Sequence, residues 1–190
     1  MASPTGPHLS ASPRESPELM LLLGPNGVGK TTIGQMLEQQ YHCKFVGIEQ
    51  FFMSRYPNPK DLADDMQGAV AEFRKHLLQM VQDSRHPVIF EETGVNPFLL
   101  SLIQQLSTEC SMVTIHIQAS ETICQERVVR RGSAANYAKN PKFVAEKRAE
   151  FFAQVIPVLA IDAEFRNDRK LGTDLQDPFS QYLHRRPSSA

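Results

Sequence analysis

A glycine-rich turn between a short apolar run and an amphipathic segment restricts the fold of this chain more than any other feature. Residues 24–31 read GPNGVGKT and match the pattern G-x-x-x-x-G-K-[ST] at every fixed position. The preceding residues, 19–23, are continuously apolar, which is typical of a strand buried on both faces of a parallel sheet. The next segment, about 30–40, places its apolar side chains on one helical face. The pattern predicts a strand, a glycine turn and a helix in succession.

The turn has the residue types that bind a polyphosphate. Glycines allow positive φ, so that successive backbone N–H groups converge on one anion, and the helix N-terminus adds partial positive charge. In this pattern Lys30 reaches the β- and γ-phosphates, and the Thr31 hydroxyl ligates Mg²⁺. We therefore expect ATP as co-substrate with Mg²⁺, although the pattern does not separate ATP from GTP. The predicted ATP-binding residues are Gly24, Pro25, Asn26, Gly27, Val28, Gly29, Lys30, Thr31 and Thr32.

Apolar periodicity in the rest of the chain alternates between strands and helices. Further strands are predicted at about 45–48, 88–90, 112–117 and 158–161. Helices are predicted over 61–83, from Asn96-Pro97, from Ser120 to about 131, and from Asn140-Pro141. This order indicates an α/β fold in three layers, α/β/α, with a five-stranded parallel sheet.

Length and composition bound the organisation of the chain. Its 190 residues suffice for one domain, which we expect over 18–185 with a short lid at about 131–141. Residues 1–17, rich in Pro and Ser, are expected to form a flexible tail, and 186–190 a frayed end. The three cysteines show no metal-ligand spacing and are expected to be buried or half-buried free thiols.

Charge and hydropathy exclude several partners. The net charge of −1 gives no reason to expect nucleic acid or a membrane surface as a partner. No apolar run approaches the ~18 residues of a membrane span, so a soluble, cytoplasmic protein is expected. The sequence does not decide between a monomer and a dimer.

The glycine turn alone does not choose among nucleotide-binding proteins. The sequence GPNGVGKTT resembles the phosphate-binding loop of ABC ATPases. However, no LSGGQ-like signature follows, and the chain is short for that fold. An N-K-x-D motif, which a GTPase needs to read guanine, is absent.

Over residues 19 to about 165 the order and spacing of motifs resemble those of the shikimate kinase, gluconate kinase and nucleoside monophosphate (adenylate) kinase group. The resemblance implies a P-loop NTPase fold, in which residues 24–31 are the Walker A motif. It implies an ATP-dependent phosphotransferase, a P-loop small-molecule kinase. The implied acceptor is a small soluble molecule: a nucleotide, a nucleoside, or a hydroxy or sugar acid.

The resemblance assigns the acceptor's activation to Glu49. Shikimate kinases carry an F-x-D-x-D segment after the phosphate loop, and the corresponding residues here are Phe45-Val46-Gly47-Ile48-Glu49. Glu49 takes the place of the second acid, which in that family sits beside the acceptor hydroxyl. Gly47 replaces the first acid, which supports Mg²⁺.

Two consecutive acids follow the predicted strand at 88–90. Shikimate kinases have a G-G-G turn there, whereas this chain has Glu91-Glu92-Thr93-Gly94, so it departs from that family. The pair resembles a Walker-B-type strand end. We expect Glu91 to support Mg²⁺ with Thr31 and Glu92 to contact the acceptor, while the reverse assignment stays open. Strand alternation predicts that one of the two faces away from the site.

Five arginines take roles from the same resemblance. Arg127 and Arg131 match the E-R-x-x-x-R start of the adenylate kinase lid and would clamp the transferring phosphoryl group. With Lys30 and Glu49 they complete the expected catalytic residues. Arg55, Arg74 and Arg148 lie where acceptor-binding arginines are expected. Arginine suits anionic acceptors because its fork binds carboxylate or phosphate bidentately.

Two alternatives to a kinase stay open. One is a regulatory ATPase or nucleotide-binding switch without a small acceptor, and the other is a catalytically degenerate binder, which the glycine at position 47 favours. The acceptor is also undetermined, because Arg55 and Arg74 suggest an anion whereas Glu91 and Glu92 suggest hydroxyls or amines.

Overall fold

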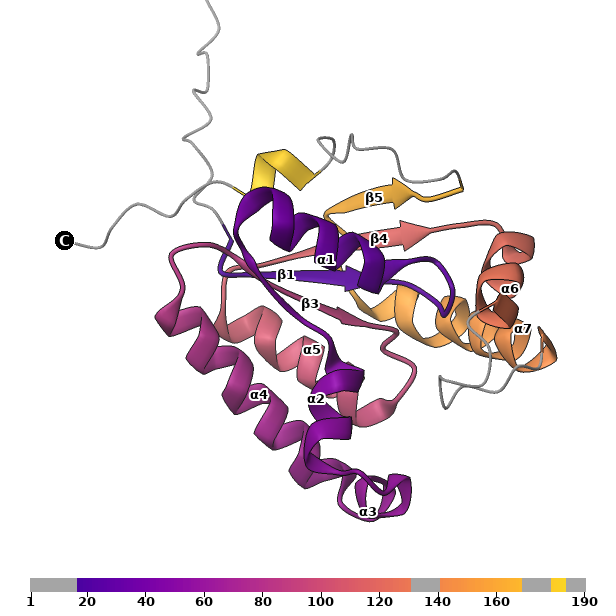
Figure 1. The fold of residues 1–190 in the computed structure, drawn as a ribbon, viewed down its shortest axis with the longest axis horizontal. Coiled ribbons are helices and arrows are strands. Elements are labelled where there is room, and N and C mark those ends of the chain that lie inside the picture. Colours follow the sequence, from indigo (N-terminus) through magenta and orange to yellow (C-terminus); the bar gives the residue numbers. More distant parts are fainter. Residues whose placement is uncertain (1–16, 131–140, 169–178, 184–190) are drawn as a thin grey trace, which may run out of the picture.

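The fold was obtained as a computed structural model that describes residues 17–130, 141–168 and 179–183 (Figure 1). Over these ranges five parallel strands form one sheet, which confirms the predicted α/β class. The strands are β1 (Leu19–Leu23), β2 (Lys44–Val46), β3 (Val88–Glu92), β4 (Met112–Gln118) and β5 (Ala163–Arg166). Their order across the sheet is β2-β3-β1-β4-β5.

Seven α-helices connect and cover the described strands. They are α1 (Lys30–Tyr41), α2 (Ile48–Arg55), α3 (Pro59–Asp64), α4 (Met66–Asp83), α5 (Pro97–Glu109), α6 (Glu121–Arg130) and α7 (Pro141–Glu150). A π-helical turn η2 (Phe151–Val155) and a 3₁₀ turn η3 (Ile156–Val158) continue from α7, and a last 3₁₀ turn η4 covers Ser180–Tyr182.

The sheet is buried between two helical layers, as Figure 1 shows. Every side chain of β1 is fully buried. Leu19, Leu21 and Leu23 pack toward α4, α5 and η2, whereas Met20 and Leu22 pack toward α1 on the opposite face. Burying each such side chain contributes about 1.5–3 kcal/mol, so β1 anchors both layers of the core.

The strand order brings the phosphate loop next to the two acids. From β1 the chain passes to one side for β2 and β3 and then crosses to the other side for β4 and β5. In open α/β sheets ligands bind at the carboxyl ends of strands where the order reverses in this way. In the register of β1 with β3, Leu22 pairs with Glu91 and Leu23 with Glu92. Both acids therefore sit beside the end of β1, where the loop begins.

The position predicted for the fifth strand is wrong. The apolar residues 158–161 follow the turns η2 and η3, and Val158 is 51% exposed. The strand β5 begins only at Ala163 and pairs with β4, with Ala163 opposite Ile115. An edge strand needs only alternate burial, which is why the sequence AEFR can form one.

Three boundaries also differ from the prediction. Ile48 does not extend β2 but begins α2, a helix that the sequence analysis did not predict. The helix predicted over 61–83 is divided at Asp65 into α3 and α4. Glu91 and Glu92 lie within β3 rather than after it.

Residues 1–16 of the expected tail, residues 131–140 of the expected lid and the expected frayed end lie outside the described residues. The last residue of the expected lid, Pro141, begins α7. Of the three cysteines, Cys43 and Cys124 are buried and Cys110 is half-buried, and all three are free thiols, as predicted. In the described part of the chain no helix combines the length and apolar character needed to span a membrane.

Candidate active site

The loop between β1 and α1 has the backbone conformation that its glycines predict. Gly27 and Gly29 adopt φ of +85° and +98°, which side chains disfavour, and Gly29 caps the N-terminus of α1. A Cβ atom at Gly27 would lie 2.5 Å from the carbonyl oxygen of Cys124 on α6. Glycine is therefore required at this position both by conformation and by packing. The loop ends at a helix N-terminus, where backbone N–H groups favour a bound anion.

Lys30 is a nearly buried cation at the first residue of α1. Its side chain is part of a residue only 8% exposed, and Nζ donates to the carbonyl oxygens of Gly24 at 2.7 Å and Pro25 at 3.2 Å. These bonds hold the ammonium group along the loop. A positive charge in such a shielded place attracts phosphate more strongly than one in bulk water.

Thr31 and Glu91 join α1 to β3 at the same end of the sheet. The Thr31 hydroxyl donates to both carboxylate oxygens of Glu91, at 2.8 and 2.9 Å. A hydroxyl and a carboxylate are the hard oxygen ligands that suit Mg²⁺. Among the described residues there is no cluster of three or more His, Cys, Asp or Glu side chains that could hold a metal ion. Thr31 and Glu91 therefore fit an ion that takes its other ligands from phosphates and water.

Glu92 has different partners from its neighbour. Its Oε1 accepts hydrogen bonds from Thr93 N at 2.8 Å, Thr93 Oγ1 at 3.0 Å and Gly94 N at 3.2 Å. Burial raises the pKa of Glu92, and these donors and Lys30 counteract only part of that effect. Glu92 thus holds the turn after β3.

Glu91, Glu92 and Glu49 all line one cavity of about 540 Å³, which also reaches Lys30 and Thr31. The expectation that one of the paired acids would face away from the site is wrong. The cavity lies across the end of the sheet, where side chains from both faces reach it. Glu49 reaches it from the first turn of α2, where the helix dipole stabilises a negative charge.

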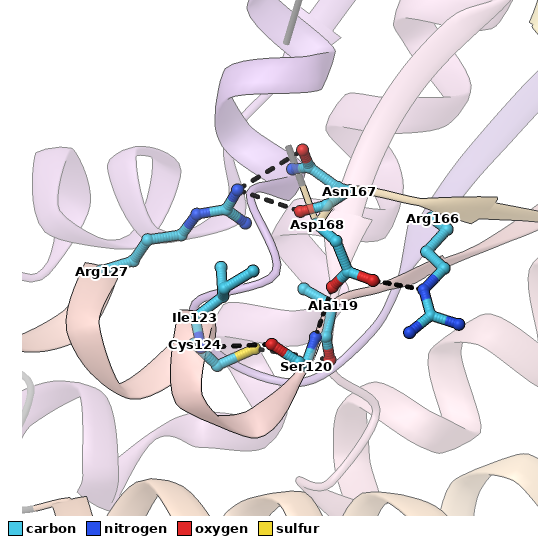
Figure 2. A network of polar contacts seen from close by, with 8 residues as sticks. All are labelled: Ala119, Ser120, Ile123, Cys124, Arg127, Arg166, Asn167 and Asp168. Atoms are coloured by element: carbon cyan, nitrogen blue, oxygen red, sulfur yellow. Dashed lines mark hydrogen bonds and ion pairs between the residues drawn. The ribbon is translucent and has the colours of Figure 1, made fainter. Parts of the chain in front are cut away.

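Arg127 of α6 contacts the backbone of the phosphate loop and, as Figure 2 shows, Asn167 after β5. Its Nη1 donates to the carbonyl oxygens of Val28 at 3.1 Å and Gly27 at 3.3 Å, and its Nη2 to that of Asn167 at 3.0 Å. Asn167, only 2% exposed, donates from Nδ2 to the Val28 carbonyl at 2.7 Å. The loop is therefore fixed to α6 and to the segment after β5.

Asp168 extends this network to the start of α6. As Figure 2 shows, its carboxylate lies between Arg166 and Ser120, and it accepts a hydrogen bond from Ser120 N at 2.7 Å. These contacts lower the pKa of Asp168, mainly through the Arg166 hydrogen bond.

Of the four predicted arginines that the structure describes, none lines the cavity, and Arg127 contacts backbone carbonyls of the loop instead of the space expected for the transferring group. Arg55 pairs with Glu72 at 3.3 Å and its guanidinium lies 4.1 Å from the centre of the Phe51 ring. Arg74 pairs with Glu109 of α5. Arg148 lies over the Phe152 ring at 5.1 Å and contacts the Cys124 sulfur at 3.9 Å. Arg131 falls outside the described residues.

The chain is similar to one known protein family and to several small-molecule kinases. The family described as an AAA domain matches residues 19–154, which is most of the chain. The chain belongs to this family. A shikimate kinase from Azobacteroides pseudotrichonymphae is 25% identical over 162 residues, which are 78% of this chain and 93% of that protein.

Solved structures of similar fold include two small-molecule kinases. A gluconokinase from Sinorhizobium meliloti superimposes with a TM-score of 0.53 at 15% identity, covering 90% of this chain and 91% of that one. A shikimate kinase from Acinetobacter baumannii, in complex with shikimate, gives 0.55 at 14% identity, covering 85% and 87%. These matches confirm the predicted P-loop NTPase fold. The sequence relative and both solved structures are small-molecule kinases, which is the class of protein that the sequence predicts for this chain.

The sequence analysis missed Asn167 and the apolar wall of the cavity. Asn167 was not predicted because the fifth strand was placed a few residues too early. With the strand placed correctly, an amide directly after an edge strand would have marked Asn167 as a candidate site residue. The wall is formed largely by α2 and α3. Its signal was present in Phe52, Tyr56 and Leu62, which were not assigned to a site.

Proposed function

We propose that this chain transfers the γ-phosphoryl group of Mg·ATP to a hydroxyl of a small acceptor bound in the 540 Å³ cavity. The main support for the proposal is that a single cavity contains both a phosphate-binding end and an end with a carboxylate suited to an acceptor. Lys30 and Thr31 lie at the first, and Glu49 reaches the same space from α2. A phosphoryl donor and its acceptor can therefore meet inside one enclosure.

At the phosphate end, the loop amides and Lys30 hold the β- and γ-phosphates. Thr31 and Glu91 would hold Mg²⁺, which, when bound, neutralises charge on the phosphates. Lys30 stabilises the charge that develops on the transferring group, in a site where little water competes. Shikimate kinases carry an acid that supports Mg²⁺ where this chain has Gly47. We assign that support to the Glu91 carboxylate instead.

At the acceptor end, Glu49 receives the proton of the acceptor hydroxyl. The freed oxygen forms a bond to the γ-phosphorus, while the bond from that phosphorus to the bridging oxygen breaks and ADP leaves. A carboxylate suits this role because it can orient the nucleophile and accept its proton in the same geometry. Glu92 shapes the acceptor end through its bonds to Thr93 and Gly94.

Arg127 positions the loop from behind through the Gly27 and Val28 carbonyls. Arg131, at the start of the expected lid, is proposed to clamp the transferring group. Closing such a lid would exclude water and suppress ATP hydrolysis.

The proposal is tested by ADP formation from Mg·ATP with nucleosides, nucleoside monophosphates, shikimate and gluconate as acceptors. We expect one class to stimulate ADP formation strongly and Lys30→Ala and Glu49→Gln to lose that stimulation. Far-UV circular dichroism of both variants checks that they fold. A flat panel with a slow, Lys30-dependent background would instead support a regulatory ATPase.

A further inference from the structure

We infer that the acceptor is an alcohol with an apolar or aromatic body and no negative charge. The inference deepens the proposed function and rests on it. Side chains from α2 and its C-cap, α3 and α5 form the largely apolar wall of the cavity away from the phosphate loop: Ile48, Phe52, Met53, Tyr56, Leu62 and Leu99. A wall of this kind contributes binding energy by burying apolar surface, not by pairing with charge.

The charged groups that line the cavity are mostly acidic. Three carboxylates, Glu49, Glu91 and Glu92, reach it, and Lys30 is the one cation that lines it among the described residues. Lys30 lies at the loop end, where its Nζ is 2.7 Å from the Gly24 oxygen. Bound ATP would add further negative charge beside Lys30. At the acceptor end, therefore, no cationic side chain among the described residues is available to pair with an anion.

Two arginines on α2 and α4, helices that contribute side chains to the cavity lining, are directed elsewhere. Arg55 shares α2 with Phe52 and Met53, but its guanidinium packs on Phe51 and pairs with Glu72 of α4. Arg74, also on α4, pairs with Glu109 of α5. Both cations are neutralised outside the cavity, so neither supplies the bidentate fork that a carboxylate or phosphate acceptor would need.

The charge of an acceptor determines how much free energy its burial in this cavity costs. An anion moved from water to an apolar wall with no partner loses its hydration without compensation. A neutral molecule of the same shape avoids that cost, and an ammonium group gains attraction from the carboxylates. The cavity of about 540 Å³ also takes the transferring phosphate at its loop end, so the acceptor occupies only the part beside the apolar wall.

The test compares three probes of one skeleton that differ in charge. They are 4-(hydroxymethyl)benzoate, its methyl ester, and 4-(aminomethyl)benzyl alcohol, titrated into the full chain with Mg·ADP. Binding is followed by NMR of ¹³C-labelled methionine methyl groups, because Met53 and Met66 line the cavity. We expect the ester and the amine to shift these methyl signals with a Kd at least about tenfold below that of the acid.

The inference is overturned by acid binding as tight as ester binding, or by no shift of Met53 and Met66 with either the ester or the amine. Met53→Arg, which adds a cation to the wall, should raise the affinity for the acid at least about fivefold, while Met53→Gln should not. An unchanged acid affinity in Met53→Arg also contradicts selection by charge.

The same probes test the proposed function separately when Mg·ATP replaces Mg·ADP. Binding of the ester with no Lys30-dependent phosphorylation of any acceptor contradicts the kinase proposal and leaves the charge preference standing. Efficient Lys30-dependent phosphorylation of the acid over the ester supports the kinase and overturns the inference.

Discussion

The Thr31 hydroxyl donates hydrogen bonds to both carboxylate oxygens of Glu91, at 2.8 and 2.9 Å. The two residues are 60 positions apart, and they meet because β1 and β3 are neighbours in the sheet. This contact places a hydroxyl and a carboxylate where the phosphate loop enters α1, which is where Mg·ATP would need them.

Replacing Glu91 should therefore weaken the use of Mg²⁺. We expect Glu91→Gln to lower kcat about 10–100-fold and to raise the Mg²⁺ concentration needed for half-maximal activity, because the amide carries no charge. Thr31→Ser keeps the hydroxyl and should stay near the wild-type values. The measurement is ADP formation against Mg²⁺ concentration. An unchanged Mg²⁺ dependence in Glu91→Gln would show that Glu91 does not help to hold Mg²⁺.

Asn167 should stabilise the fold as well as the nucleotide site. Asn167→Ala removes the bond from Nδ2 to the Val28 carbonyl in a place that is 2% exposed, so we expect a loss of about 1–3 kcal/mol in the free energy of unfolding. Urea denaturation measures that loss, and the KM for ATP should rise with it. Ser107→Ala, an exposed truncation on α5, serves as the control and should change stability by less than about 0.5 kcal/mol. Equal stability of the two variants would contradict the role given to Asn167.

Glu92 should make the protein less stable as pH rises. Burial raises its pKa above the ordinary value of 4.5, so the unfolded chain releases this proton at lower pH than the folded chain. Its contribution to stability is complete below about pH 4.5 and is lost as pH rises through the folded pKa. Glu92→Gln cannot ionise but still accepts from Thr93 and Gly94, so its Tm advantage over wild type should grow with pH.

Melting curves of wild type and Glu92→Gln between pH 4 and 8 measure this difference. A Tm difference that stays constant across the range would show that Glu92 ionises equally in the folded and unfolded chain.

Arg55 and Arg74 should contribute little to catalysis, since each pairs outside the cavity. We expect Arg55→Gln and Arg74→Gln to keep kcat/KM within about twofold and to lose no more than about 1 kcal/mol of stability, as is usual for partly exposed ion pairs. Steady-state kinetics with the best acceptor of the panel decides the matter. A rise of tenfold or more in the acceptor KM would restore the acceptor-binding role that the sequence predicted for them.

The phosphate loop and the sheet were predictable because their signals are local. Glycines at fixed spacing after an apolar run require a strand, a turn and a helix in that order, and Lys30 and Thr31 follow from the same pattern. The proximity of Glu91 to Thr31 was predictable only in outline, since it depends on which strand lies beside β1.

The misplaced elements depend on contacts between distant segments. The apolar residues 158–161 resemble a strand, yet η2 and η3 extend the preceding helix to Val158, and the real edge strand carries charged residues. The direction of Arg74 is set by Glu109, 35 residues later on another helix. No pattern within α4 could reveal that partner.

Phosphoryl transfer to a small molecule is tested most directly by ³¹P NMR of the chain incubated with Mg·ATP and the acceptor panel. We expect a phosphomonoester signal that grows with ADP, is absent with Lys30→Ala, and is absent without acceptor. ADP formed only together with inorganic phosphate, whichever acceptor is present, would contradict transfer to a small molecule and identify the chain as an ATPase.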